Sequence, residues 1–424
     1  MKRQTRLATA FAMITACLLF ASGGAAQQAT PDTLSPQHYV AGERSRLLEL
    51  SPSGELVAGI NDDEELCSFE VPSGDEIACV DVRQQKISVD FESISWAPDS
   101  SAFVFSVPAF AYFTDGDLWM FDANTGDLNN LTDDGIEGKL PLTGDLAAGE
   151  VMNVDVAPVW SPDGASIAFS RSIITAETGL DAPNELWVLD VASGDAKRVA
   201  TVDENSIGVL YYGLLWSPDG QMLYATYNFY SDVDPDHDAS GVHAIDLATG
   251  EDTLITGRSS DFRDDVPTVM SISPDGKTLV VCFADYVLSA QRSGTGGYAL
   301  LSTADGSLTP VDPPADIDPD QAFAITPAFS ADGNTLVYAV VRFTTPGGLV
   351  MARDLETGEE TIIATLPDGA LPVAIARNQS LIIGANGTAL LPVSPFEAYL
   401  VQISDSAPRQ GHIEISLLTP EPVG

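Results

Sequence analysis

A short phrase recurs along the chain and constrains the fold more than any other feature. The copies read Ser-Pro-Asp-Gly or a close variant, and successive copies are 46 to 64 residues apart. They begin at Ser51, Ala97, Ser161, Ser217, Ser273 and Ser330, with a degenerate seventh copy at Ala376. A repeat of roughly 40–60 residues is typical of a propeller or a solenoid built from one supersecondary unit.

The neighbours of each phrase indicate the strands of that unit. The copy at Ser161 lies between the apolar runs 156–160 and 166–169. Proline presets φ at the first turn position, aspartate bonds to its own backbone and glycine accepts a positive φ, so the phrase predicts a hairpin turn. A second run that enters a tight turn, such as 118–122 followed by 123–126, also recurs in the units. The pattern predicts four strands per unit, here called a, b, c and d.

Seven units of four short strands match a β-propeller, which has about 4–8 four-stranded blades. We therefore expect an all-β fold, a single seven-bladed β-propeller of four-stranded antiparallel blades over residues 45–416. Trp96, Trp160 and Trp216 end strand a and are expected to pack in the core or between blades. The short a–b and c–d turns would share one face and the long b–c and d–a loops the other. Because loops on a rigid scaffold usually carry function, a binding site is expected on the b–c/d–a face.

The repeats resemble those of TolB-type, WD-like propellers, which also occur in dipeptidyl-peptidase-like enzymes. The resemblance rests on residues 158–164 with 167–170, and on 118–122 with 125–126 and 131–134. It covers about residues 45 to 416 and implies a fold but little about function. Three departures accompany it. We expect neither the α/β domain of TolB nor the hydrolase domain of the peptidases, and seven units exceed the six blades of TolB.

The first residues predict a signal peptide. A basic start is followed by an apolar run over residues 7–20 and by small residues up to Ala26, which favours cleavage after Ala26. The expected organisation is a signal peptide at 1–26, a flexible lead-in at 27–44, the propeller and a C-terminal tail at 417–424. Export to the periplasm or the exterior follows, and acylation of Cys17 as a lipoprotein is the alternative. No other stretch approaches the ~18 apolar residues of a transmembrane span.

The chain is strongly acidic. Its formal charge is −42, and removal of a leader with three basic residues and no acid makes it −45 (−42 − 3). Such a surface repels nucleic acid and anionic lipid, so neither is expected as a partner. The acidity has two interpretations: solubility, as in a salty habitat, or attraction of a cation or a basic partner. A monomer is expected.

The cysteines outside the leader fit an exported protein. Cys67 and Cys79 flank a turn around Ser73 at equal distances, which places them opposite each other on strands c and d of the first blade. A disulfide between them is predicted in an oxidising compartment. Cys282 lies in an apolar run and is expected to be a small buried hydrophobic residue.

Aromatic and acidic residues share the loops of the b–c/d–a face. The candidate binding residues are Phe110, Tyr112, Phe113, Tyr227, Phe229 and Tyr230. Carboxylates of the same loops include Asp115, Asp117, Asp133, Asp134, Asp264, Asp265, Asp316, Asp318 and Asp320. Aromatic side chains among carboxylates suit a sugar or a basic peptide, and they equally suit packing of the loops.

One loop carries aspartates at alternate positions. They are Asp232, Asp234, Asp236 and Asp238, and this spacing directs several carboxylates at one hard cation such as Ca²⁺. The loop lacks the glycine at position six and the glutamate at position twelve of an EF-hand. A solvated acidic loop is the favoured interpretation and a calcium site is the alternative, so no cofactor is required.

Catalytic motifs are scarce. No Gly-x-Ser-x-Gly elbow and no His-x-x-x-His pair occurs among the 424 residues. The sequence therefore favours an exported, non-catalytic propeller that binds a protein or a cell-envelope component through its acidic, aromatic loop face. The alternative is a hydrolase or lyase that uses carboxylates at the central channel, with or without a metal. A buried carboxylate cluster would favour the enzyme, and a broad aromatic patch would favour the binding protein.

Overall fold

The computed structural model describes residues 38–40, 46–71, 73–90, 93–107, 116–135, 146, 149–178, 182, 184–201, 212–227, 240–259, 266–283, 297–311, 322–342, 348–366, 382–394 and 397–402. All of them belong to one compact unit, residues 35–424. In this described part the regular secondary structure consists of 28 β-strands. The all-β prediction is confirmed. No helix in the described part is long and apolar enough to cross a membrane.

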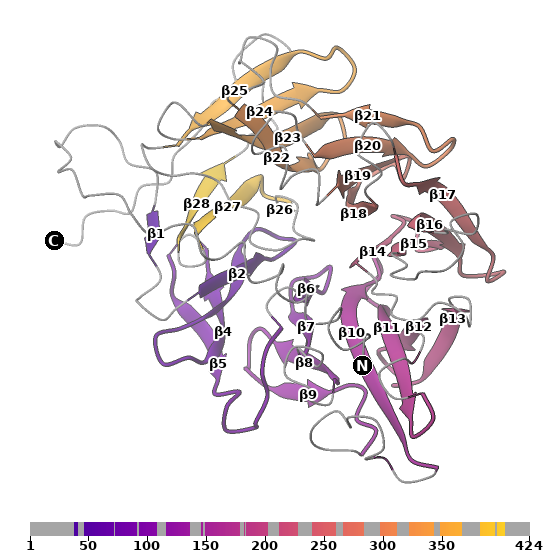
Figure 1. Cartoon of the computed structure of the whole chain (residues 1–424). Helices are drawn as coiled ribbons and strands as arrows, with labels where there is room; N and C mark the ends of the chain where they lie inside the picture. The colour runs from indigo at the N-terminus through magenta and orange to yellow at the C-terminus, as the bar shows by residue number, and fades with distance from the viewer. Residues whose placement is uncertain are drawn as a thin grey trace, which may run out of the picture. The chain divides into compact units, whose positions relative to one another are not determined.

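Six antiparallel sheets are each built from four consecutive strands of the chain (Figure 1). Blades 1 to 3 are β2 (Arg46–Leu50), β3 (Leu56–Ile60), β4 (Leu66–Glu70) and β5 (Glu76–Val80); β6 (Ser95–Trp96), β7 (Ala102–Ser106), β8 (Leu118–Asp122) and β9 (Leu128–Asn130); and β10 (Val151–Trp160), β11 (Ser166–Thr175), β12 (Asn184–Asp190) and β13 (Ala196–Thr201). Blades 4 to 6 are β14 (Tyr212–Trp216), β15 (Met222–Tyr227), β16 (Gly241–Asp246) and β17 (Asp252–Gly257); β18 (Pro267–Ile272), β19 (Thr278–Phe283), β20 (Tyr298–Ser302) and β21 (Leu308–Pro310); and β22 (Ala322–Phe329), β23 (Thr335–Arg342), β24 (Leu349–Asp354) and β25 (Glu360–Thr365).

A further four-stranded sheet, the closing sheet, joins the two ends of the unit. It consists of β26 (Ile382–Ile383), β27 (Thr388–Ser394), β28 (Glu397–Gln402) and β1 (His38–Val40), and β1 pairs antiparallel with β28. The expectation of a single seven-bladed propeller is therefore wrong, because the propeller has six blades. In the described part, six blades are single repeats of the chain, and the closing sheet takes its outer strand from the segment that was expected to be a flexible lead-in.

The a–b turn of the closing sheet also differs from the prediction. The degenerate copy at Ala376 lies outside the described residues, and the turn falls at residues 384–387 instead. The amide of Gly387 donates to the carbonyl of Gly384 at 2.8 Å, and the amide of Thr388 donates to Asn386 Oδ1 at 2.9 Å. These bonds match those of the Ser-Pro-Asp-Gly turns. Since residues 384–387 read Gly-Ala-Asn-Gly, the motif itself did not reveal them.

Hydrogen bonds link neighbouring blades at the ends of their first strands. The indole nitrogen of Trp96 donates to the carbonyl of Glu49 at 3.2 Å, and that of Trp216 donates to the carbonyl of Val159 at 3.1 Å. The amide of Ala385 donates to the carbonyl of Pro52 at 2.7 Å, which joins the closing sheet to blade 1. These contacts support the predicted role of tryptophan between blades.

The two short turns of a blade lie at the same end of its sheet. In blade 1 the amide of Val71 donates to the carbonyl of Glu55, and in blade 2 the amide of Ala123 donates to the carbonyl of Ser101. Equivalent bonds join the a–b and c–d turns of blades 3 to 6. The b–c and d–a connections therefore leave from the opposite end, as expected, although much of their length lies outside the described residues.

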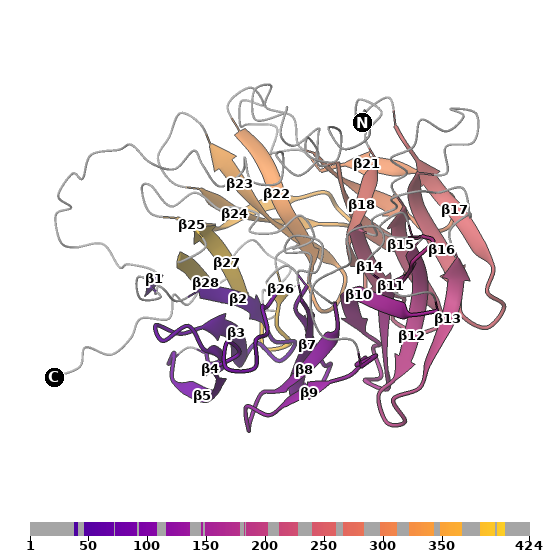
Figure 2. The ribbon, with the colours of Figure 1, turned by 60° about the horizontal axis from the view of Figure 1, so that its bottom comes forward.

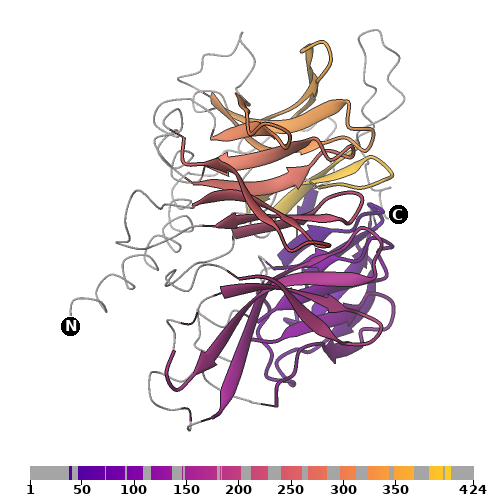
Figure 3. The same ribbon diagram turned by 90° about the vertical axis from the view of Figure 1, so that its right-hand side faces the viewer.

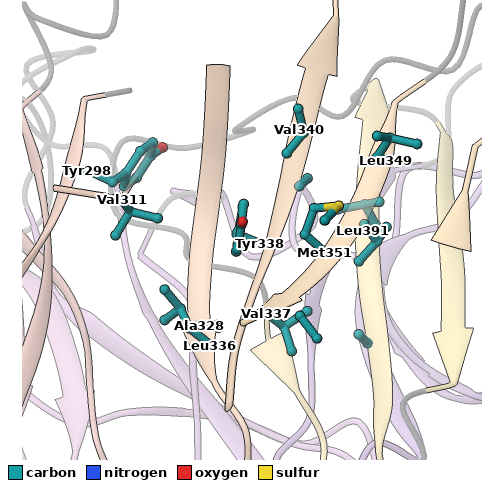
Figure 4. Close-up of a cluster of buried hydrophobic side chains, with 14 of the residues drawn as sticks. Tyr298, Val311, Ala328, Leu336, Val337, Tyr338, Val340, Leu349, Met351 and Leu391 are labelled. Carbon is teal, nitrogen blue, oxygen red and sulfur yellow. The ribbon is translucent and has the colours of Figure 1, made fainter. Parts of the chain in front are cut away.

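The largest apolar cluster spans blades 5 and 6 and the closing sheet. Figure 4 shows Tyr298 of β20, Tyr338 of β23 and Leu391 of β27 contributing to it, and each side chain is at most 2% exposed. Burial of such side chains stabilises a fold by about 25 cal/mol per Å² of apolar surface removed from water. Apolar packing between neighbouring blades therefore holds their sheets together.

Blade 3 has the longest a–b hairpin among the described strands. β10 and β11 are ten residues long; Figures 1 and 3 show them as the long magenta pair, and Figure 2 labels them beside β12 of the same blade. A bulge between Val156 and Val159 re-aims β10, and Ala157 adopts a φ of 54° there. Beyond the bulge, Val154 bridges to Gly116 of blade 2. The first half of β10 thus lies against blade 2, at the end of the blades where the long loops leave.

Candidate functional site

Carboxylates gather where blade 2 meets the extended hairpin of blade 3. Asp117 directly precedes β8, Asp133 and Asp134 follow β9, and Asp155 lies in the middle of β10. Together with Arg171 of β11 we call these residues the blade 2–3 site. Asp117, Asp133 and Asp134 are among the acidic residues that the sequence places on the b–c/d–a face.

Backbone and side-chain hydrogen bonds hold this site together. The amide of Asp155 donates to the carbonyl of Gly116 at 2.7 Å, so β10 is tied to the residue before Asp117. The amide of Leu118 donates to Thr132 Oγ1 at 3.0 Å, which joins the start of β8 to the loop after β9. The amide of Asn153 donates to Asp134 Oδ2 at 2.7 Å. Asp134 and Asp155 are therefore held in place by hydrogen bonds between blades 2 and 3.

Asp155 and Arg171 form a buried ion pair. Arg171 donates through Nε and Nη2 to the two oxygens of Asp155, both at 2.6 Å, and the Asp155 side chain is 0% exposed. The guanidinium lies 4.8 Å from the ring centroid of Trp187 and 5.1 Å from that of Phe169. Burial raises the pKa of Asp155, whereas the bonds and charge of Arg171 oppose that shift. Two parallel hydrogen bonds thus fix the guanidinium of Arg171 on the carboxylate of Asp155.

Asp117 is in a different electrostatic position. Its Oδ2 accepts a hydrogen bond from Asn130 Nδ2 at 2.7 Å, and its buried Oδ1 has no partner among the described residues. Burial raises the pKa of Asp117 to about 6, Asn130 opposes the shift, and the charges of Asp134, Asp155 and Asp133 add to it. The carboxyl therefore takes up a proton at mildly acidic pH, and its unpaired oxygen is a ready acceptor.

The blade 2–3 site is not a preformed metal centre. Within the described part of the chain, the one group of three potential ligand atoms within 4.8 Å of one another belongs to Cys67, Glu76 and Cys79 of blade 1. The carboxylates beside Arg171 suit a larger cation, such as an ammonium or a guanidinium group, which bonds to them through several hydrogens.

The other predicted binding and metal residues mostly lie outside the described residues. This applies to Phe110, Tyr112, Phe113, Phe229, Tyr230, Asp232, Asp234, Asp236 and Asp238. Tyr227 is described and is 2% exposed. Its ring stacks on His243 with centroids 3.9 Å apart, and its hydroxyl donates to Asp252 Oδ2 at 3.0 Å. In this arrangement Tyr227 packs inside blade 4.

The two cysteines of blade 1 occupy the paired positions that the turn indicated. Cys67 of β4 faces Cys79 of β5, and a disulfide joins them with a Cα–Cα distance of 4.2 Å. Cys282 lies buried on β19, as expected.

Sequence reasoning missed Asp155 and Arg171. Both lie inside long strands and pair directly across the hairpin. Opposite charges in the middle of two strands that flank one turn were the available signal, because buried charges in a sheet require partners. The site as a whole depends on blade 2 lying against β10, which no local pattern reveals.

No family model and no curated protein matches the chain. Similar solved structures include oligogalacturonate lyase from Vibrio parahaemolyticus (13% identity, 84% of this chain and 79% of that chain, TM-score 0.47). They also include TolB from Acinetobacter baumannii (14%, 83% and 78%, 0.41) and prolyl oligopeptidase B from Galerina marginata (17%, 77% and 42%, 0.47). The chain is a propeller similar to TolB, as its repeats predicted. At these identities the likeness concerns the fold alone.

Proposed function

We propose that the chain is an exported binding scaffold that takes a cationic group of a protein or cell-envelope component at the blade 2–3 site. One observation carries the proposal: Asp117 feels the negative charges of three neighbouring carboxylates, those of Asp133, Asp134 and Asp155, and one of its oxygens has no partner among the described residues. A cationic side chain would donate a hydrogen bond to Asp117 Oδ1 and would offset the negative charge of the neighbouring carboxylates.

The charge of the whole protein supports the same partner class. A formal charge of −42 attracts basic surfaces over a distance of about a Debye length and speeds their encounter. At contact, a charge-assisted hydrogen bond to Asp117 adds about 1.5–3 kcal/mol. The two contributions to binding can therefore be separated. Attraction by the net charge weakens with added salt, whereas recognition at the site also weakens when Asp117 is replaced.

The test uses a short peptide of lysine and arginine, titrated calorimetrically into the wild type, Asp117→Asn and Asp127→Asn. Asp127 is exposed in the c–d turn of the same blade and so loses the same charge at the opposite end. We expect Asp117→Asn to weaken binding about tenfold, as the loss of about 1.4 kcal/mol implies, and Asp127→Asn to change it little. Equal weakening by both variants, or binding that is independent of salt, would contradict the proposal.

A second candidate function is acid–base catalysis, and the pKa of Asp117 favours it. A carboxyl with a pKa of about 6 donates a proton near neutrality, as the acid of a hydrolase or lyase must. A screen of nitrophenyl glycosides, lactones and uronate polymers tests this idea, with Asp117→Asn as the inactive control. Activity that declines as pH rises through about 6 would support it, and turnover that survives Asp117→Asn would remove Asp117 from the reaction.

The calcium site at Asp232, Asp234, Asp236 and Asp238 stays a prediction. Added calcium should raise the melting temperature of the wild type, and the double variant Asp234→Ala/Asp236→Ala should lose that rise. An unchanged melting temperature in the wild type at millimolar calcium would end the idea.

A further inference from the structure

The corner of blade 1 around its disulfide holds three side chains of metal-binding type. Cys67 lies on β4, and Cys79 and Glu76 lie on β5. One sulfur or oxygen from each lies within 4.8 Å of the others. A bulge in the pairing of β4 with β5, between Ser68 and Phe69, brings Glu76 to the side of the sheet that carries Cys79. In the oxidised chain both sulfurs are engaged with each other.

The amide of Asn61 marks the centre of this group. Its Nδ2 donates to Glu76 Oε1 at 3.2 Å and to Glu65 Oε2 at 3.1 Å, and it lies 3.9 Å from Cys79 Sγ. Its Oδ1 accepts from the amides of Asp63 and Glu65, which locks the turn before β4. One weakly positive NH₂ group therefore serves two carboxylates and a sulfur, and a divalent cation would serve the same acceptors with more charge.

We propose that reduction of the Cys67–Cys79 disulfide converts this corner into a Zn²⁺ site with Cys67, Cys79 and Glu76 as ligands. A dithiol reductant supplies two electrons and two protons, breaks the S–S bond and is itself oxidised to a disulfide. Zn²⁺ then displaces the two thiol protons to solvent and forms two Zn–S bonds. Glu76 supplies an oxygen, and Glu65 or water takes the fourth position of the tetrahedron.

The geometry suits this exchange. Two sulfurs bound to one tetrahedral zinc at about 2.3 Å lie roughly 3.8 Å apart, a spread that side-chain rotation provides while the strands stay paired. Cys79 is half-buried whereas Cys67 is fully buried, so a reductant reaches the Cys79 sulfur first. Thiolate ligands favour Zn²⁺ over Ca²⁺ and Mg²⁺, and the nearby carboxylates favour a divalent cation. The disulfide is thus the closed state of a redox-gated metal site.

The test measures metal uptake by the full chain, oxidised or anaerobically reduced with excess dithiol that is then removed. We expect reduced wild type to bind one more Zn²⁺ than the Cys67→Ser/Cys79→Ser variant, which retains Cys17 and Cys282. With Co²⁺ as the probe, the same sample should show thiolate-to-cobalt charge-transfer absorption, and the oxidised chain should not. Glu76→Gln should weaken Zn²⁺ binding about tenfold, while Asp75→Asn, an exposed neighbour on the same hairpin, should not.

Two results would overturn the proposal. One is equal zinc uptake by the reduced wild type and the double cysteine variant. The other is loss of β-sheet circular dichroism on reduction, because the site requires β4 and β5 to stay paired without the disulfide. Neither result depends on what binds at the blade 2–3 site.

Discussion

Blades 3 and 6 use the same unit of arginine, aromatic ring and carboxylate in two different surroundings. In blade 6, Arg353 lies over the ring of Tyr338 at 5.3 Å and donates through Nε and Nη2 to Glu360 Oε1 at 2.8 and 2.6 Å. The hydroxyl of Tyr338 donates to the same oxygen at 2.7 Å. In blade 3, Arg171 plays the equivalent part for Asp155, but further carboxylates lie beside the pair.

The role of each ion pair depends on its position in the blade. The Glu360 network lies on strands b, c and d of a single blade and balances one charge with one charge. Burial, followed by the hydrogen bond to Glu360, raises the pKa of Tyr338, so its hydroxyl stays protonated and donates. Asp155 lies instead on the first strand of its blade, against blade 2, where Asp117 and its neighbours leave an excess of negative charge. The Glu360 network joins three strands of one blade, whereas the Asp155–Arg171 pair lies beside further carboxylates.

Replacing an arginine of either network should change the free energy of unfolding the most. Arg171→Met leaves Asp155 buried without its counter-charge and should lower the free energy of unfolding by about 3–5 kcal/mol. Arg353→Met should cost less, about 1–3 kcal/mol, because Glu360 is 21% exposed whereas Asp155 is 0% exposed. Urea unfolding of both variants measures the difference, and equal losses would break the distinction between the two networks.

The next effect is removal of the blade 6 carboxylate. Glu360→Gln replaces charge-assisted hydrogen bonds from Arg353 and Tyr338 with neutral ones, and should destabilise the chain by about 1–2 kcal/mol at pH 7. The measurement is again denaturant unfolding, with Glu359→Gln, an exposed neighbour, as control. A stabilising Glu360→Gln would show that blade 6 also carries uncompensated negative charge.

The smallest effect has the opposite sign. The folded-state pKa of Asp117, about 6, lies above its ordinary value of 3.8, so the folded chain holds this proton more tightly than the unfolded chain. Stability from this group is therefore present below about pH 4 and is lost as pH rises towards 6. Asp117→Asn should thus stabilise the chain at pH 7, by about 1 kcal/mol after screening by solvent, and should have little effect at pH 4. A destabilising Asp117→Asn at pH 7 would contradict the raised pKa.

The repeated turns were predictable because their physics is local. Ser161 Oγ donates to Asp163 Oδ1 at 2.6 Å and accepts from the amide of Ser166 at 2.9 Å, so six residues define the hairpin. The closing sheet was not predictable in this way. β1 has three residues and pairs His38 with Tyr399 at the other end of the chain, and the turn at 384–387 lacks serine, proline and aspartate.

The candidate site likewise has a part that local sequence predicted and a part that depends on contacts between blades. Asp117, Asp133 and Asp134 were assigned to the correct face because they lie where strands begin or end, and strand direction follows from the turns. The raised pKa of Asp117 depends instead on its burial and on the charge of Asp155 from blade 3, and the role of Asp155 depends on Arg171 across the longest hairpin of the described part. Such contacts between blades leave no periodic trace in the sequence.

The pairing of His38–Val40 with Glu397–Gln402 has a consequence for biosynthesis. A ribosome delivers β1 first and β28 nearly last, so this seam waits until translation of the whole repeat array is complete. A protease cut just after Val40 would leave the outer strand of the closing sheet held only by its pairing with β28, while all six contiguous blades stay intact.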